Sequence, residues 1–154
     1  MKKYVFFWQG NSPFSNWYPS PFNFEGVEFN CAEQYMMYQK AKFFNDTYIM
    51  EQVLKTSSPK EQKALGRQVK NFNADRWSAN CLSIMEKGLV EKFIQNEKIY
   101  NYLKSFEKDS IFVEASPFDR IWGIGYNERD ALNNIENWGQ NLLGNLITKI
   151  NKII

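Results

Sequence analysis

The fold is decided at residues 30–44, NCAEQYMMYQKAKFF, where the chain changes from extended to helical patterning. Asn30 is a residue type that caps helices, and Glu33 follows three positions later. This spacing is typical of a capping box, in which each side chain binds a backbone N–H group of the other residue. It predicts a helix that begins after Asn30 and ends near Phe44.

The residues before this helix form short extended segments. Residues 22–24 and 27–29 are apolar runs on either side of Glu25 and Gly26, which predicts a small hairpin. Residues 4–8 form another apolar run, which the turn-forming residues 10–13 end. These patterns indicate a small β element near the N-terminus.

The residues after this helix are mostly helical in pattern. Ser58 and Pro59 give a strong start signal, a capping serine followed by proline at the first helical position. Two short runs, residues 111–113 and the glycine-punctuated residues 121–125, favour β structure. We expect a single α+β domain over residues 1–154, predominantly helical. Further helices are predicted at residues 46–55, 58–70, 75–94, 97–103 and 141–152.

The composition suits one compact domain, because 44% of the 154 residues are hydrophobic. Nineteen basic and seventeen acidic residues give a formal charge of +2, too weak a bias to indicate a nucleic-acid or membrane partner. No apolar run approaches the ~18 residues of a membrane-spanning helix. Cys31 and Cys81 lie outside any CxxC motif, which favours two reduced, buried thiols. We expect a cytoplasmic protein with no membrane partner.

The chain contains no histidine. This excludes Ser-His-Asp and Cys-His catalysis, histidine-liganded zinc, and histidine as the acid–base group. Chemistry must come from carboxylates, lysines, tyrosines or backbone dipoles. The chain also has thirteen Phe, eight Tyr and five Trp. Such an aromatic surplus builds either a dense core or a pocket for a planar ligand.

Glu33 and Lys40 are seven positions apart on the helix predicted at residues 31–44. Seven steps of about 100° return to within ~20° of the start, so both side chains project from nearly the same face. Met36 and Met37 lie between them. A carboxylate and an amine flanked by apolar groups is a setting that shifts pKa values. The alternative is that Glu33 only completes the capping box and that Lys40 is a solvated lysine.

A second group of polar residues lies at residues 114–125, EASPFDRIWGIG. Two carboxylates, an arginine and a tryptophan occur within nine positions, and Pro117 with the glycines favours a loop. Gly123 and Gly125 lack the third glycine of a dinucleotide-binding fingerprint. Asp119 and Arg120 also fit a simple surface ion pair.

Other residues carry either a binding or a packing interpretation. Trp17, Trp77 and Trp122 offer flat faces that could stack on a nucleobase, at ~1–3 kcal/mol per base, or could pack in the core. Gly66 inside a predicted helix costs up to ~1 kcal/mol, which close helix approach or ligand access would justify. Arg67 could then hold a phosphate or form an ion pair.

Taken in order, these segments resemble the NADAR family, also called YbiA-like. The resemblance covers about residues 6–150 and depends on the ordered set rather than on any one motif. The segments are FSNWYP (14–19), EQYMMYQKA (33–41), LGR (65–67), Trp77, GL (88–89) with KF (92–93), EASP (114–117) leading into DRIWGIG (119–125), and WGQNLLG (138–144).

The resemblance implies a mostly helical domain and an N-glycosidase that needs no metal or redox cofactor. Family branches cleave a ribosyl C–N bond, either in phosphoribosylamino-pyrimidine intermediates of riboflavin synthesis or in ADP-ribosyl-guanine of nucleic acid. The sequence does not choose between these substrates. Some members have histidine where this chain has Gln34, so that position is not an essential acid–base group across the family.

The resemblance also assigns candidate roles. Lys40 aligns with a family lysine implicated in a Schiff base with ribose C1′. Glu33 and Asp119 are the candidate carboxylates, which would stabilise positive charge at C1′, activate water or move protons. The candidates for substrate binding are Asn16, Trp17, Arg67, Trp77, Trp122, Gly123 and Asn141.

Two other functions remain open from the sequence. A module that binds ADP-ribose or a related nucleotide without cleaving it would use the aromatic and arginine contacts but not Lys40. A protein that binds nucleic acid or a protein partner through exposed aromatic residues would show salt-dependent oligonucleotide affinity. The small net charge argues against the latter.

Overall fold

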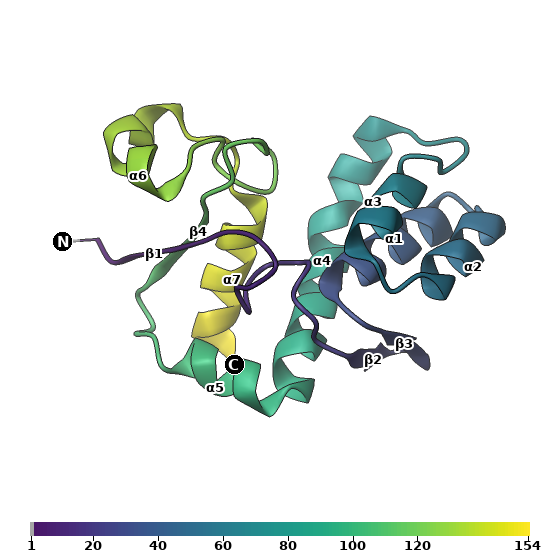
Figure 1. The fold of residues 1–154 in the computed structure, drawn as a ribbon, viewed down its shortest axis with the longest axis horizontal. Helices are drawn as coiled ribbons and strands as arrows, with labels where there is room; N and C mark the ends of the chain where they lie inside the picture. The colour runs from purple at the N-terminus through teal and green to yellow at the C-terminus, as the bar shows by residue number, and fades with distance from the viewer. Residues whose placement is uncertain (1) are drawn as a thin grey trace. The chain divides into compact units, whose positions relative to one another are not determined.

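The computed structural model describes residues 2–154. The chain forms two compact units, drawn in Figure 1. One, which we call the central unit, is the continuous segment Pro19–Glu97. The other, which we call the discontinuous unit, combines the chain up to Tyr18 with Lys98–Ile154.

The central unit begins with the predicted hairpin, β2 (Phe22–Phe24) and β3 (Val27–Phe29), which pair antiparallel. Glu25 and Gly26 between them both have positive φ, the conformation that a tight two-residue hairpin turn requires. Helix α1 (Ala32–Phe43) follows and packs against the other three helices of this unit. These are α2 (Thr47–Lys55), α3 (Pro59–Gly66) and α4 (Ala74–Gln95).

Side-chain caps start three of these helices. Asp46 accepts a hydrogen bond from the N–H of Ile49, and Ser58 accepts one from the N–H of Glu61, as their positions predicted. Asn73 caps α4, which therefore begins slightly earlier than the sequence indicated. The prediction that the third helix reaches residue 70 was wrong: α3 ends at Gly66. The N–H of Lys70 instead donates to the Asp46 carboxylate at 2.9 Å, which holds the chain in a turn.

The predicted capping box at Asn30 and Glu33 was also wrong. Cys31 occupies the N-cap position of α1, and its side chain makes no capping hydrogen bond. Gln34 reaches back in place of Glu33, and its Oε1 accepts the N–H of Asn30 at 2.7 Å. The Asn30 side chain donates to the carbonyl of Ser57 instead of capping the helix. The side chain that binds the N–H of Asn30 is thus one residue later than the spacing suggested, and the Asn30 side chain has a partner from a distant segment.

The discontinuous unit is built on a two-stranded parallel sheet. Strand β1 (Tyr4–Phe7) pairs with β4 (Ile111–Glu114), with Tyr4 opposite Ile111. Helix α7 (Leu142–Ile153) packs along β4, as Figure 1 shows. Val113, Ala115 and Ile124 belong to the core of this unit. Its remaining helices are α5 (Glu97–Lys104, which begins at the boundary), α6 (Glu128–Ala131) and a 3-10 helix, η1 (Leu132–Asn137).

Residues 121–125 form a loop, so the prediction of β structure there was wrong, and the loop expected from Pro117 and the glycines is confirmed. The carbonyl groups of residues 120–124 are bound by backbone N–H groups of residues 139–143, at the start of α7. The N–H of Leu142 donates to Ile121, and the N–H of Leu143 donates to Trp122, both at 3.1 Å. The loop therefore satisfies donors that a helix N-terminus otherwise leaves open, and α7 has no side-chain cap. Helices α6 and η1 were not predicted.

No helix within residues 2–154 has both the length and the apolar character that crossing a bilayer requires. Both cysteines are buried and free, which confirms the expectation from their spacing.

Candidate active site

Glu33 lies at the second position of α1 and is 3% exposed. The N–H of Asn30 donates to Gln34, so the capping bond predicted for the Glu33 carboxylate is not formed. The first turn of a helix carries partial positive charge, so it favours an anionic side chain there. A buried acidic group at a helix start is therefore a candidate for chemistry.

Lys40 lies in the last turn of α1 and is half-buried. Burial lowers the pKa of its amine below the ordinary value, Glu33 opposes this shift, and Arg67 adds to it. The interactions with Glu33 and Arg67 agree with the prediction that Glu33 and Lys40 share a face. A lowered pKa increases the fraction of neutral amine, the form that attacks an electrophile.

The close approach of α3 to α1 accounts for Gly66. A Cβ at this position would lie only 1.9 Å from Met37 Sδ. Of the two explanations that the sequence left open for Gly66, close helix approach and ligand access, this contact supports the first. Arg67 follows it immediately, is exposed, and acts electrostatically on Lys40. The packing of Gly66 against α1 thus fixes the backbone position from which the Arg67 side chain extends.

Trp77 belongs to α4 and is half-buried. Its ring meets those of Phe43 and Phe44 at centroid distances of 6.0 and 6.5 Å. These contacts favour the packing interpretation of this tryptophan. Glu33, Lys40, Arg67 and Trp77 are the four candidate residues that the central unit contains.

The discontinuous unit contains the other six candidates. Asn16 is 8% exposed, and its Oδ1 has no hydrogen-bond partner among the described residues. A buried amide oxygen without a partner is costly, and a ligand hydroxyl or amine would satisfy it. Trp17 beside it is exposed, and its backbone N–H donates to Ser15 Oγ.

Asp119 organises the loop that follows β4. Its Oδ1 accepts the N–H groups of Ile121 and Trp122 at 2.8 and 2.9 Å. Arg120 donates to the carbonyl of Asn137, so the two neighbours bind backbone groups rather than forming an ion pair with each other. Trp122 is half-buried. Asp119 therefore has a structural role whatever its chemistry.

Two further candidates are packed tightly in this unit. A Cβ on Gly123 would lie 2.8 Å from the carbonyl oxygen of Glu114, so no larger residue fits without movement. Asn141 is buried in the left-handed conformation. Its side chain accepts the N–H of Glu114 and donates to the carbonyl of Phe112. Both amide atoms of Asn141 are thus used to join the start of α7 to β4.

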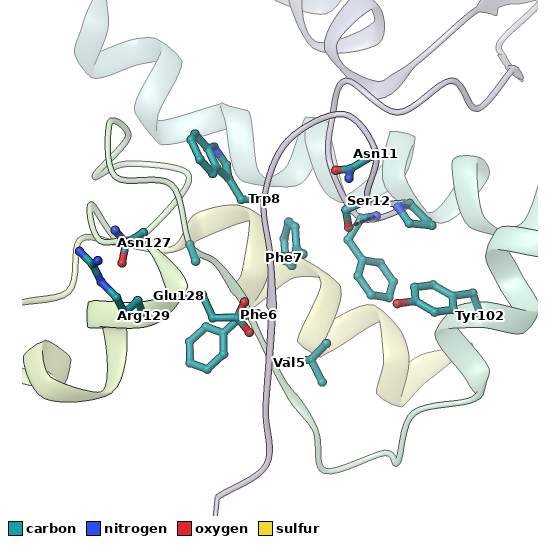
Figure 2. Close-up of a pocket in the computed structure, with 13 residues that line it drawn as sticks. Val5, Phe6, Phe7, Trp8, Asn11, Ser12, Tyr102, Asn127, Glu128 and Arg129 are labelled. Atoms are coloured by element: carbon teal, nitrogen blue, oxygen red, sulfur yellow. Dashed lines mark hydrogen bonds between the residues drawn. The ribbon is translucent and has the colours of Figure 1, made fainter.

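A pocket of about 680 Å³ opens along β1 in the discontinuous unit. Figure 2 shows Phe6 and Trp8 on one side of the strand, with Phe7, Ser12 and Tyr102 toward the other side. None of the ten candidate residues lines it.

Sequence reasoning did not assign a role to Lys92. This residue of α4 is completely buried, and burial lowers its pKa to about 7, an effect that nearby Cys31 opposes. Burial in turn raises the pKa of the Cys31 thiol to about 11. The signal was available: Lys92 takes the position four residues after Gly88 and seven after Met85, on the buried stripe of the helix.

Within residues 2–154, no group of three or more histidine, cysteine, aspartate or glutamate side chains is arranged to hold a metal ion. The arrangement on α1 can instead supply a nucleophilic amine and a carboxylate.

The NADAR domain model matches residues 6–154, and the chain belongs to the NADAR domain family. This confirms the resemblance inferred from the ordered sequence segments.

Its relatives include named enzymes. An N-glycosidase of Acanthamoeba polyphaga mimivirus is 40% identical over 161 residues, which cover 96% of this chain and 94% of the relative. An N-glycosidase of Nostoc punctiforme is 30% identical over 122 residues, which cover 79% of this chain and 77% of the relative. A riboflavin biosynthesis protein of Vibrio vulnificus is 27% identical over 111 residues, 72% of this chain and 29% of that protein.

The solved structure of the Escherichia coli protein YbiA matches the fold. The TM-score is 0.80 at 24% identity, over 99% of this chain and 86% of that one. This likeness confirms the predicted class, a predominantly helical α+β fold of the YbiA type.

Proposed function

We propose that this chain is an N-glycosidase that hydrolyses the C–N bond between ribose C1′ and a nucleobase-type group. Family membership and the two relatives named N-glycosidase support the activity class. The observation that carries the mechanism is the pairing on α1 of buried Glu33 with Lys40, whose amine has a lowered pKa.

The reaction begins with neutral Lys40. Its amine attacks C1′ while the electron pair of the C1′–N bond leaves with the base, and the proton that the attacking amine loses passes to the base. The ribosyl-lysine then opens: the C1′–O4′ bond breaks, its electron pair goes to O4′, protonated Glu33 gives that oxygen a proton, and the lysine nitrogen forms an iminium with C1′. Water adds to C1′ and returns a proton to Glu33. The new hydroxyl then passes its proton to the lysine nitrogen, which departs as the neutral amine and releases the sugar as an aldehyde.

We propose Asp119 as the second carboxylate, and Trp17, Arg67, Trp77, Trp122 and Gly123 as substrate-binding residues, on the family resemblance. The unpartnered Oδ1 of Asn16 supports a direct contact with ribose or phosphate. Asn141 acts by holding β4 and the start of α7, because both atoms of its amide bind backbone there.

The substrate is either ADP-ribosyl-guanine in nucleic acid or a phosphoribosylamino-pyrimidine. The name of the Vibrio relative supports the pyrimidine, and the reacting bond is the same in both. We place the enzyme in the cytoplasm, where free buried thiols persist and such sugar nucleotides are found. No metal, redox cofactor or membrane enters this mechanism.

Mass spectrometry of the two substrates incubated separately with the protein tests this function. We expect sugar release from one of them, and borohydride should trap a sugar adduct on Lys40. Lys40→Ala should abolish both signals, and Glu33→Gln should lower the rate by about 10²- to 10⁴-fold. The matched control is Lys42→Ala, an exposed lysine on the same helix, which should keep full turnover.

Full turnover by folded Lys40→Ala would exclude the Schiff base. Tight binding of ADP-ribose without product over a prolonged incubation would show that the chain is a binding module instead. Salt-dependent affinity for oligonucleotides regardless of ADP-ribosylation would show a nucleic-acid-binding protein.

A further inference from the structure

Phe72 lies between α3 and α4, and its ring covers the amine of Lys40. The Lys40 Nζ is 4.5 Å from the ring centroid. The ring also meets that of Phe44, edge to face, at 5.4 Å. Asn71, just before it, is in the left-handed conformation, which turns the chain at this point. Phe72 is thus held against the reactive amine from a separate segment of the chain.

Core packing does not account for this ring, because Phe72 is 45% exposed. An aromatic face is electron-rich and attracts a cation placed over it. The cation here is an amine that burial has partly removed from water. The other charged groups that act on it are Glu33 and Arg67, and Arg76 lies instead over the rings of Phe43 and Phe44.

We propose that Phe72 is a catalytic residue of this N-glycosidase, whose ring face stabilises the positive charge that forms on Lys40 Nζ when the amine attacks C1′ and the iminium develops. The inference rests on the function proposed above. It assigns to an aromatic ring an electrostatic task in a chain that has no histidine.

The mechanism predicts a specific pH dependence. The ring favours the cation over the neutral amine, so it raises the pKa of Lys40, in opposition to burial. Below that pKa the free enzyme already carries the cation, and the ring stabilises the starting state and the transition state alike. Above that pKa the starting amine is neutral, so the ring stabilises only the transition state, in which the nitrogen carries positive charge. Removing the ring should therefore lower the rate at high pH and leave the rate at low pH unchanged.

The first test is the pH profile of kcat/KM for Phe72→Leu. Its plateau at high pH should fall by about 2- to 30-fold, the range expected of a cation–π contact, while its acidic limb overlaps that of the wild type. Phe72→Tyr should restore the plateau. The matched control is Tyr48→Leu, an exposed ring on α2, which should leave the whole profile unchanged.

The second test separates charge from shape. Trifluorophenylalanine at position 72 keeps the ring but weakens its negative face, so its plateau should fall toward that of Phe72→Leu. A trifluoro variant that matches the wild type would overturn the proposal and leave Phe72 a packing residue. An equal loss at all pH values would overturn it as well.

The third test needs no turnover. The pKa of Lys40, followed by NMR of the labelled side chain, should be about 0.3 to 1.5 lower in Phe72→Leu than in the wild type. An unchanged pKa would refute the charge contact even in an active enzyme. A lowered pKa in a protein that cleaves neither substrate would refute the proposed function and leave the contact intact.

Discussion

Gly88 in α4 is a position where a single added methyl group should destabilise the protein. It faces the ring of Tyr35 on α1, and a Cβ there would lie 2.2 Å from Cε2 and 2.5 Å from Cδ2 and Cζ. Tyr35 cannot move aside, because it is 1% exposed and contacts the rings of Phe22 and Phe29. Its hydroxyl donates to the carbonyl of Ile84 at 2.7 Å, which fixes the far end of the ring.

The magnitude for Gly88→Ala follows from three contributions. Overpacking against a rigid ring costs about 1–3 kcal/mol. Loss of the tyrosine hydrogen bond adds about 1 kcal/mol. Alanine returns about 1 kcal/mol because it is the better helix former. The net effect is a destabilisation of about 1–3 kcal/mol, and a fall in Tm of about 2–12 °C for a chain of this length.

Thermal unfolding followed by circular dichroism measures this shift. Gly10→Ala is the matched control, because its Cβ would lie no nearer than 3.7 Å to another side chain, that of Trp17, which is an ordinary van der Waals distance. Its Tm should stay within a few degrees of the wild type. A Gly88→Ala protein as stable as the wild type would show that α1 and α4 have room to separate, and would refute the reasoning.

Two further predictions concern charged groups. Asp119→Ala should destabilise the protein by about 1–3 kcal/mol in urea unfolding, since two N–H groups of the loop lose their acceptor. Asp119→Asn should keep the Tm but lower the rate of sugar release. Full activity in the asparagine variant would exclude a catalytic carboxylate at this position. Lys92 has a pKa of about 7 in the folded protein, against an ordinary value of 10.5. Between pH 7 and 10.5 its amine is therefore protonated in the unfolded chain but largely neutral in the folded protein. Wild-type stability should therefore rise with pH across that window, by up to ~1.4 kcal/mol per pH unit, while Lys92→Met should lack this slope. Parallel stability curves for the two proteins, measured by urea unfolding from pH 7 to 10, would contradict the buried titration.

The parts of the fold that local chemistry determines could be predicted from the sequence. Ser58 and Asp46 bind N–H groups three residues away, and the hairpin turn needs only residues 25–26. The failures arise where a distant partner competes. The Asn30 side chain binds the carbonyl of Ser57 instead of capping α1, and the Asp46 carboxylate accepts the N–H of Lys70 beyond α3.

The same distinction applies to the candidate site. The shared face of Glu33 and Lys40 follows from helix geometry alone, so the spacing of the two residues was enough to predict it. The ring of Phe72 over that amine could not be predicted, because its position depends on how the segment after α3 folds back. For Asn141, the place in a motif suggested a ligand contact, whereas the structure shows that both atoms of its amide bind the backbone of β4.

The pairing of β1 with β4 also sets the order in which the chain can fold during synthesis. Tyr4 and Ile111 are more than one hundred positions apart, so the ribosome releases the whole central unit before the partner of β1 exists. At about 5–20 residues per second, the apolar strand waits for several seconds with both edges unpaired. Lys2 and Lys3 just before it provide charges of the kind that restrain aggregation of such a strand. Closing so long a loop is slow, which makes docking of the N-terminal strand a late step and exposes the nascent chain to chaperones until it is complete.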